Sequence, residues 1–214
     1  MDEVRIEWLR PEEIEKRSFE IISAELAERG IVLPKAEEMI TKRVIHTSAD
    51  FDYAKTMTFS QNAVDIAEKL LLSGADIVTD TNMALSGINK KTLAKLGGEA
   101  HCFMADEDVV KQAKERGITR AAVSMEKARE IEQPVIFVIG NAPTALIRLY
   151  EMMQEGGFKP AFVIGVPVGF VNVEAAKELI MSAGIPYIVN RGRKGGSNIA
   201  AAICNALLYQ VGER

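Results

Sequence analysis

The stretch VIFVIGNAPTALIRLYEMMQEGG, residues 135–157, carries the pattern that decides the fold. It opens with five consecutive apolar residues, which is typical of a strand that is buried on both faces. After the turn residues Gly140 and Asn141, apolar side chains recur at helical spacing. They are Ala142, Ala145, Leu146, Leu149 and Met153. A buried strand followed at once by an amphipathic helix is the repeating unit of a parallel α/β sheet.

The same alternation of strand and helix extends along the chain on both sides of this unit. Short apolar runs predict strands at 76–79, 100–103, 135–139, 161–164 and 187–190. Amphipathic stretches predict helices at 105–117, 142–157, 173–184 and 197–210. The sequence therefore predicts an α/β fold with a parallel sheet of about five strands, covered by helices on both faces.

The N-terminal third has a different pattern, with three helices expected at 10–30, 34–46 and 60–74. The apolar stripe of the first is Ile14, Ile21 and Ile22, and Ser18 lies on the same face. The second is expected to turn Ala36, Met39, Ile40 and Val44 inward, and Ser60 is the expected N-cap of the third. We expect one domain, 1–214, with N-terminal helices at 1–73 and the sheet at 74–214. The helices pack against the sheet or extend to a partner, and the pattern leaves both open.

Composition excludes several classes of protein. The 214 residues are 48% hydrophobic and 26% charged with a net charge of -4, which argues against non-specific nucleic-acid binding. No apolar run approaches the roughly 18 residues of a membrane span, and "MDEVRIEW" is unlike a signal peptide, so the cytoplasm is expected. Cys102 and Cys204 lack metal-site spacing and are interpreted as buried thiols. Because His101 and Cys102 are adjacent on a strand, they point apart, and no metal site is expected.

Three loops that leave the strands are unusual, and ligands of open parallel sheets bind beyond the carboxyl ends of the strands. In the first loop, Asn141 can cap a helix and Thr144 adds a hydroxyl in its first turn. In the second, IGVPVGFV, Gly169 lets a ligand approach the backbone closely. The third loop, NRGRKGGS, is rich in cations and glycines, and its members are Arg191, Gly192, Arg193, Lys194, Gly195, Gly196 and Ser197.

The third loop predicts an anion site, with Ser197 as the expected cap of the next helix. It matches neither GxxxxGK[ST] nor GxGxxG, so no standard nucleotide fingerprint is present. A tight connection with solvated cations is the alternative for this loop alone. Three such loops on one sheet edge favour a ligand site, and the local cations on an acidic chain imply a large polyanion.

His46, in RVIHTSAD, is the candidate acid or base. It lies seven residues after Met39 and is therefore expected to continue an inward row, near a helix C-terminus that favours the protonated form. Such a histidine suits general acid catalysis. The alternative is a buried or capping histidine bonded to Asp50 or a carbonyl, and the residues alone favour it. In the same way, Ser18 is expected to bond a carbonyl, and Arg120 to lie on a helix surface.

Five segments together resemble the precorrin-8X methylmutase family, also called cobalt-precorrin-8 methylmutases. They are EKRSFEII (15–22), RVIHTSAD (43–50), IGNAPTAL (139–146), GVPVGFVNVEAAKELI (165–180) and RGRKGGSNIAAAICNAL (191–207). The resemblance runs from about residue 6 to residue 208. Where the family more often has Glu-Ser-Lys, this chain has Glu174, two alanines and Lys177, so the acid and the lysine remain.

The resemblance implies a flavodoxin-like, doubly wound three-layer fold and a homodimer with its active site near the interface. It implies an isomerisation that moves a methyl group from C11 to C12 of a corrin ring, without external methyl donor, metal or other cofactor. His46 falls on the family's catalytic histidine, which protonates a ring nitrogen. Ser18 falls on a substrate-contact position, with Arg17 and Arg120 as neighbours.

A corrin substrate carries many carboxylates around a flat apolar ring, so its site needs cations and helix N-termini at the rim. The expected rim consists of Asn141, Thr144, Gly169, Arg191, Arg193, Lys194, Gly195 and Ser197. Two alternatives are an enzyme that binds a nucleotide through RGRKGGS and a tetrapyrrole carrier without activity. The sequence leaves open whether the substrate contains cobalt, which subunit supplies each wall, and what Asp50 and Asp52 do.

Overall fold

The computed structural model describes residues 6–212, and it confirms the α/β class with a sheet of six strands. The strands are β1 Met57–Phe59, β2 Asp76–Thr79, β3 Ala100–His101, β4 Val135–Ile139, β5 Phe162–Gly165 and β6 Tyr187–Asn190. Their order across the sheet is β1-β6-β5-β4-β2-β3, and β1 alone is antiparallel to its neighbour. All five predicted strands are present, and β1 is an additional edge strand that the apolar pattern did not reveal.

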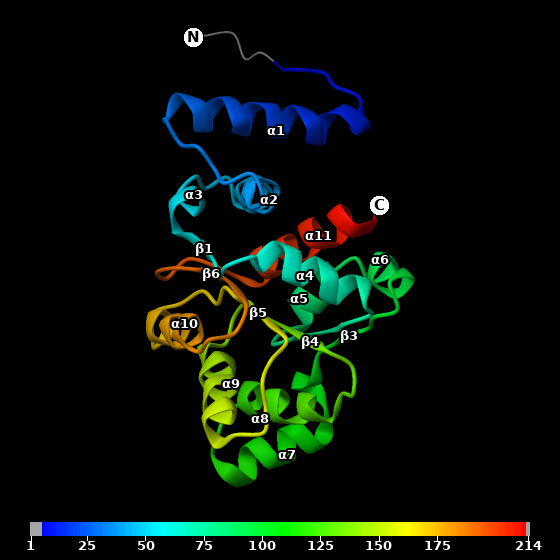
Figure 1. Ribbon diagram of the computed structural model, residues 1–214, viewed down its shortest axis with the longest axis vertical. Coiled ribbons are helices and arrows are strands. Elements are labelled where there is room, and N and C mark those ends of the chain that lie inside the picture. The colour runs from blue at the N-terminus through cyan, green and yellow to red at the C-terminus, as the bar shows by residue number, and fades with distance from the viewer. Residues whose placement is uncertain (1–5, 213–214) are drawn as a thin grey trace.

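Helices cover both faces of this sheet, which gives the predicted three layers (Figure 1). The helices are α1 Pro11–Glu28, α2 Glu38–Ser48, α3 Tyr53–Thr56, α4 Ala63–Leu72, α5 Asn82–Gly87, α6 Lys90–Lys95, α7 Glu107–Arg116, α8 Arg120–Lys127, α9 Pro143–Glu155, α10 Val173–Ser182 and α11 Ser197–Gly212. Helices α4, α5, α6 and α11 lie on one side of the sheet, and α7 to α10 lie on the other (Figure 1).

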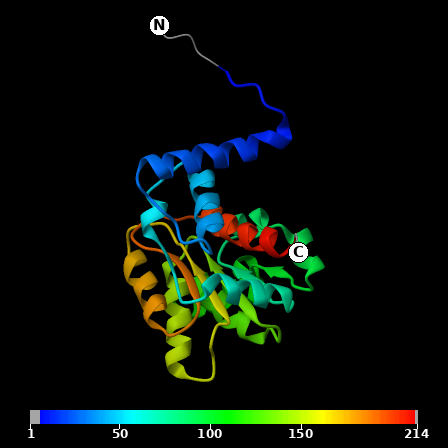
Figure 2. The ribbon, with the colours of Figure 1, turned by 45° about the horizontal axis from the view of Figure 1, so that its top comes forward.

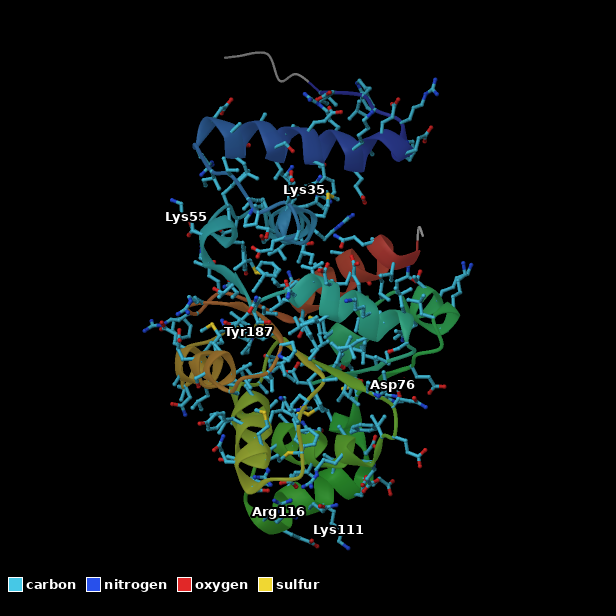
Figure 3. All side chains as sticks on the ribbon, in the orientation of Figure 1. Lys35, Lys55, Asp76, Lys111, Arg116 and Tyr187 are labelled. Carbon is cyan, nitrogen blue, oxygen red and sulfur yellow. The ribbon has the colours of Figure 1, made fainter. Side chains whose placement is uncertain are left out.

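The core forms two clusters, one on each face of the sheet. Because successive strand residues point to opposite faces, Ile136 and Ile164 join the cluster under α11, while Phe137 and Val163 join the cluster over α9 and α10. All four are buried, which explains why the strands appear as unbroken apolar runs. Figure 3 shows the side chains that occupy the space between the layers.

The N-terminal helices both pack against the body and extend from it. Helix α2 packs on α11, whereas α1 packs on α2 and stands apart from the sheet (Figures 1 and 2). Ile22 is buried on α1, but Ile14 and Ile21 are 52% and 42% exposed. Much of the apolar stripe of α1 therefore has no cover within residues 6–212.

Two expectations for these helices are wrong. On the second predicted helix, Ile40 and Val44 are buried as expected, but Ala36 precedes the helix and is exposed, and Met39 is 48% exposed. The reason is that α2 is covered by α11 and α1 along a narrow stripe that leaves out Met39. Ser60 does not cap α4 either, because its hydroxyl accepts from the Tyr187 amide at 2.9 Å and ties the chain to β6.

Phe162 provides a test of this layered core, because its side chain is fully buried between the sheet and the helices above it. We expect Phe162→Ala to lower the free energy of unfolding by about 3–5 kcal/mol, measured by urea denaturation. Phe170→Ala is the matched control, because Phe170 is 82% exposed and its loss should change stability by less than about 0.5 kcal/mol. Equal losses in both variants would contradict the placement of β5.

Candidate functional site

The loops at the carboxyl end of the sheet are organised around a buried carboxylate. Asp80 follows β2 directly and accepts hydrogen bonds from the amides of Gly140, Asn141 and Ala142 at 2.9, 2.8 and 2.6 Å. It is fully buried, and burial raises the pKa of this carboxyl, with the three amide bonds acting in the opposite direction. Asp80, not Asn141, therefore satisfies the amides that lead into α9, and the expected capping role of Asn141 is wrong.

Asp80 has a consequence for the predicted ligand site. The amides of 140–142 are already occupied by a carboxylate, so only side chains such as Asn141 and Thr144 remain available to a ligand at this turn. The Thr144 hydroxyl accepts from the Thr119 hydroxyl at 2.9 Å. The sequence signal for Asp80 was an acid at the end of the run DIVTD, directly after a buried strand.

The loops after β2, β4 and β6 touch one another. The hydroxyls of Thr81 and Ser197 are 2.7 Å apart, which joins the loop after β2 to the start of α11. Gly140 lies so close to this point that a Cβ there would be 2.7 Å from the Ser197 Cα. Ser197 is the first helical residue of α11 and its side chain is buried, so it links two loops and does not precede the helix as a cap.

In the third loop, four successive carbonyls are turned toward the protein. The ammonium of Lys177, on α10, donates to the Gly192 and Lys194 carbonyls at 2.7 and 2.9 Å. The Asn190 side-chain amide donates to the carbonyls of Lys194 at 2.9 Å and Arg191 at 3.2 Å. The Gly169 amide donates to the Arg193 carbonyl at 3.1 Å, which ties this loop to the glycine loop after β5.

A glycine is required where these two loops meet. At Gly195 the backbone φ is +156°, and a Cβ would lie 2.0 Å from the Val166 carbonyl oxygen. The Gly196 amide donates to that same oxygen at 2.9 Å. The loop after β6 is therefore packed backbone to backbone against the end of β5, as the glycine-rich sequence indicated.

The three cations of this loop each have an acidic partner. Arg191 pairs with Glu178 at 2.7 Å and Arg193 with Glu174 at 3.0 Å, and both pairs are exposed on α10. The Arg193 guanidinium also lies 5.5 Å from the ring centre of Phe170, in the glycine loop.

Lys194 differs from the two arginines, because it connects the loop to the segment after α2. Its ammonium binds Asp50 at 2.5 Å and Asp52 at 2.6 Å. The hydrogen bond from Lys194 lowers the pKa of the Asp50 carboxyl, and the same two acids raise the pKa of Lys194. Asp50 also accepts a hydrogen bond from the Asp52 amide at 2.9 Å, so its carboxylate bonds both Lys194 and the backbone of the next segment.

His46 lies four residues before Asp50, at the exposed end of α2. The expectation that it points inward is wrong: His46 is exposed, as is Met39 on the same face of α2. The imidazole stacks on the Phe19 ring of α1, with ring centres 5.5 Å apart and planes 7° from parallel. The Arg43 guanidinium lies over two aromatic rings, 4.8 Å from the ring centre of Phe19 and 5.6 Å from that of Tyr209.

Two hollows meet at His46. One, of about 450 Å³, lies between α1 and the end of α2 and is lined by Ser18, Ile21, Arg29 and Phe51 among others. The second, of about 310 Å³, lies between α2 and α11. It is lined by Arg43, His46, Thr47, Gly87, Asn198, Ala201, Ala202, Asn205 and Tyr209. The histidine is therefore accessible from both, next to apolar and small side chains as well as a cation.

The remaining candidates fall into two places. Ser18 lines the larger hollow, but its hydroxyl donates to the Ile14 carbonyl at 3.0 Å, as the residue pattern predicted. Arg17 pairs with Glu7 at 2.9 Å on the exposed side of α1. Arg120 begins α8, near the Thr119–Thr144 contact, and donates to the Met104 carbonyl at 3.3 Å. Ser18 and His46 thus line one hollow and Lys194 binds Asp50, which follows α2, while Arg120 and Thr144 lie on the α8–α9 side.

Residues 6–212 contain no group of three or more histidine, cysteine or acidic side chains arranged to hold a metal ion, and no helix there is long and apolar enough to cross a bilayer. Cys204 is buried, which raises the pKa of its thiol to about 12. Cys102 is only partly buried, contrary to expectation, and the neighbouring His101 pairs with Asp76 at 3.0 Å.

Comparison with known proteins places these features in a family. The sequence model of precorrin-8X methylmutase matches residues 13–210. The cobalt-precorrin-8 methylmutase of Salmonella typhimurium is 46% identical over 208 residues, covering 95% of this chain and 97% of its own. That of Priestia megaterium is 42% identical, covering 93% and 88%. A crystal structure of precorrin-8X methylmutase from Thermus thermophilus superimposes with a TM-score of 0.84 at 37% identity, covering 94% of this chain and 98% of that one.

The buried ammonium of Lys177 predicts a pH dependence of stability. Burial lowers the pKa of Lys177 from 10.5 to about 8, and the nearby charge of Glu174 opposes this shift. Between these two pH values the unfolded chain binds more protons than the folded one, so the cost of burying the charge disappears as the pH rises. The free energy of unfolding of the native protein, minus that of Lys177→Met, should rise by roughly 3 kcal/mol across this window. Urea denaturation in buffers spanning it measures the difference, and a constant difference would contradict the buried charge.

Proposed function

The chain belongs to the precorrin-8X methylmutase family, an isomerase family of cobalamin biosynthesis, and from that premise we propose the reaction and its catalyst. The proposed reaction moves a methyl group from C11 to C12 of precorrin-8X or cobalt-precorrin-8, giving hydrogenobyrinate or cobyrinate. The observation that carries the proposal is the position of His46, which is accessible from two hollows and lies four residues before Asp50, the partner of Lys194 in the loop of cations.

In this proposal His46 is the proton donor to a ring nitrogen. A protonated ring nitrogen draws electrons from the conjugated system, which eases migration of the methyl group to the neighbouring carbon, and the proton returns afterwards. The reaction is balanced within the substrate, because one carbon–carbon bond breaks and one forms. Two features support the role of His46: the imidazole is exposed, and its stacking on the Phe19 ring fixes its plane.

We propose that the carboxylates of the substrate bind at the cationic loop and its neighbours. Arg191 and Arg193 are paired only in exposed ion pairs, which are weak and exchange readily with another carboxylate. Lys194, held by Asp50 and Asp52, adds a third positive charge to the loop. Gly169, Gly195 and Ser197 keep the backbone of these loops close together. This arrangement gives the ligand a rim of positive charge without a metal or cofactor.

The remaining proposed binding residues lie in two parts of the molecule. Ser18 and Arg17 belong to the α1 wall of the larger hollow beside His46. Asn141, Thr144 and Arg120 lie at the start of α9 and α8, where side chains face the carboxyl end of the sheet. We propose that they contact peripheral groups of the substrate on that side.

We also propose a homodimer in which a second copy covers the α1–α2 face near His46. The support is the apolar surface left open there: Trp8 is 87% exposed, Ile14 52%, Ile21 42% and Met39 48%. An uncovered apolar face of this kind is typical of a protein–protein contact. A two-fold axis near α1 would place the hollows beside His46 at the interface.

His46→Ala tests the catalytic role. We expect kcat to fall by about 10² to 10⁴, because general acid catalysis is lost, while the absorbance titration shows product affinity within about threefold of the native protein. The matched control is His101→Gln, which alters the only other histidine, bound to Asp76 away from the site. It should retain normal turnover. A His46→Ala enzyme with native kcat would eliminate the proposed proton donor.

The dimer is tested by charge insertion on the α1 face. We expect the native protein to scatter light as twice its 23.5 kDa mass and Ile14→Glu/Ile21→Glu to shift toward the monomer, since a buried carboxylate without a partner is costly. Val110→Glu, on α7 at the other end of the molecule, is the control and should remain dimeric. A native protein that is monomeric at all concentrations would refute the proposal.

A further inference from the structure

A buried cation beneath the loop 191–196 has no part in the reaction proposed above. Lys177 is only 1% exposed, and its ammonium lies against the inner side of the loop, where it bonds the Gly192 and Lys194 carbonyls. Glu174, one turn earlier on α10, pairs with Arg193 at the surface. Covered in this way, Lys177 cannot touch a ligand, so its effect on the site must pass through the loop.

The effect follows from peptide geometry. In a planar trans peptide the carbonyl and the amide hydrogen point in opposite directions. The carbonyls of residues 191 to 194 all accept hydrogen bonds from the protein: those of Arg191, Gly192 and Lys194 from the buried Asn190 and Lys177, and that of Arg193 from the Gly169 amide of the neighbouring loop. The amides of residues 192 to 195 must therefore point away from these donors. Within residues 6–212 we find no protein acceptor for these four amides.

Asn190 reinforces the same orientation. It is fully buried at the end of β6, and the Thr56 hydroxyl donates to its side-chain oxygen at 2.6 Å. Because the oxygen is taken, the amide nitrogen faces the loop and donates to the Lys194 carbonyl. The Lys194 carbonyl thus has two donors, whereas the Gly192 carbonyl depends on Lys177 alone.

The neighbouring loop after β4 shows the opposite polarity. There the buried charge is the carboxylate of Asp80, and it binds the amides of residues 140 to 142. In one loop of the edge, a buried anion thus bonds the amides. In the other, a buried cation bonds two of the four carbonyls, and Asn190 and the Gly169 amide bond the rest. Only the second presents amides together with cationic side chains.

We propose that Lys177 is a positioning residue for substrate binding: it fixes the loop after β6 with its amides outward, as a main-chain receptor for one substrate carboxylate. This rests on the proposed function, which supplies the carboxylate ligand. Several successive amides directed at one side form a recognised type of anion site. The side chains of Arg191, Arg193 and Lys194 then add positive charge around the site that the backbone amides form.

Replacement of Lys177 should therefore affect binding and not chemistry. In Lys177→Met the Gly192 carbonyl loses its only donor, so the peptide between Gly192 and Arg193 is free to rotate and its amide no longer points outward. We expect KM for the corrinoid substrate to rise at least tenfold while kcat at saturation stays within about threefold, the pattern of lost ground-state and transition-state binding together. Absorbance titration with hydrogenobyrinate should show the same loss of affinity.

Amide hydrogen exchange of the protein without ligand measures independently how firmly Lys177 holds the loop. Residues 192–195 should exchange faster in Lys177→Met than in the native protein, with α9 and α11 unchanged. Lys127→Met is the control, because the Lys127 ammonium likewise has two partners, the acids Asp106 and Asp108, but these follow β3, which three strands separate from β6. If Lys177→Met fails to fold, Lys177→Gln keeps a polar side chain of shorter reach and should show a smaller rise in KM.

The outcomes separate this inference from the proposed function. Native KM in Lys177→Met or Lys177→Gln would overturn the inference, and so would a fall in kcat with unchanged KM. Absence of turnover by the native protein would instead refute the proposed function. Exchange at 192–195 would still show in that case whether Lys177 holds the loop, and exchange equal to native would overturn the inference alone.

Discussion

The hydrogen bonds between the buried Asp80 carboxylate and three successive amides are the constraint on which the carboxyl edge of this sheet depends. It connects the end of β2 to the start of α9, across two adjacent strands. A buried carboxylate is tolerated only where several donors compensate its desolvation, so the turn cannot move without large cost. The packing of Gly140 against Ser197 and the Thr81–Ser197 contact then place α11 on this fixed turn.

On the other half of the edge, Lys177 holds the loop after β6 by bonding two of its carbonyls, and Lys194 connects this loop to the segment after α2. The loop held by Lys177 carries Lys194, whose ammonium binds the acids that follow α2. The orientation of His46 depends on the end of that helix and on Phe19. The cationic loop is in this way connected to the segment that follows the helix of the proposed proton donor, although Lys194 and Asp50 are 144 residues apart in sequence.

How much the sequence predicted depends on whether the deciding interaction is local. The five apolar runs predicted the parallel strands, because a strand that is buried on both faces is apolar at every position. Strand β1 lies at an edge and has three half-buried residues, so it has no such apolar run. The cap of α9 comes from Asp80, sixty-two residues from Ala142, so the local choice of Asn141 failed. Helical spacing placed His46 and Met39 on one face, but spacing cannot say whether anything covers that face.

The exposure of His46 is then informative and not an anomaly. A proton donor to a large planar ring must be reachable over a wide area, which a histidine in a closed core is not. The uncovered apolar residues around it, Ile14, Ile21 and Met39, would be a liability on a monomer. A second copy over this face would bury them and turn the open hollows beside His46 into an enclosed site, where a charge on the imidazole acts at lower dielectric and more strongly on the ring.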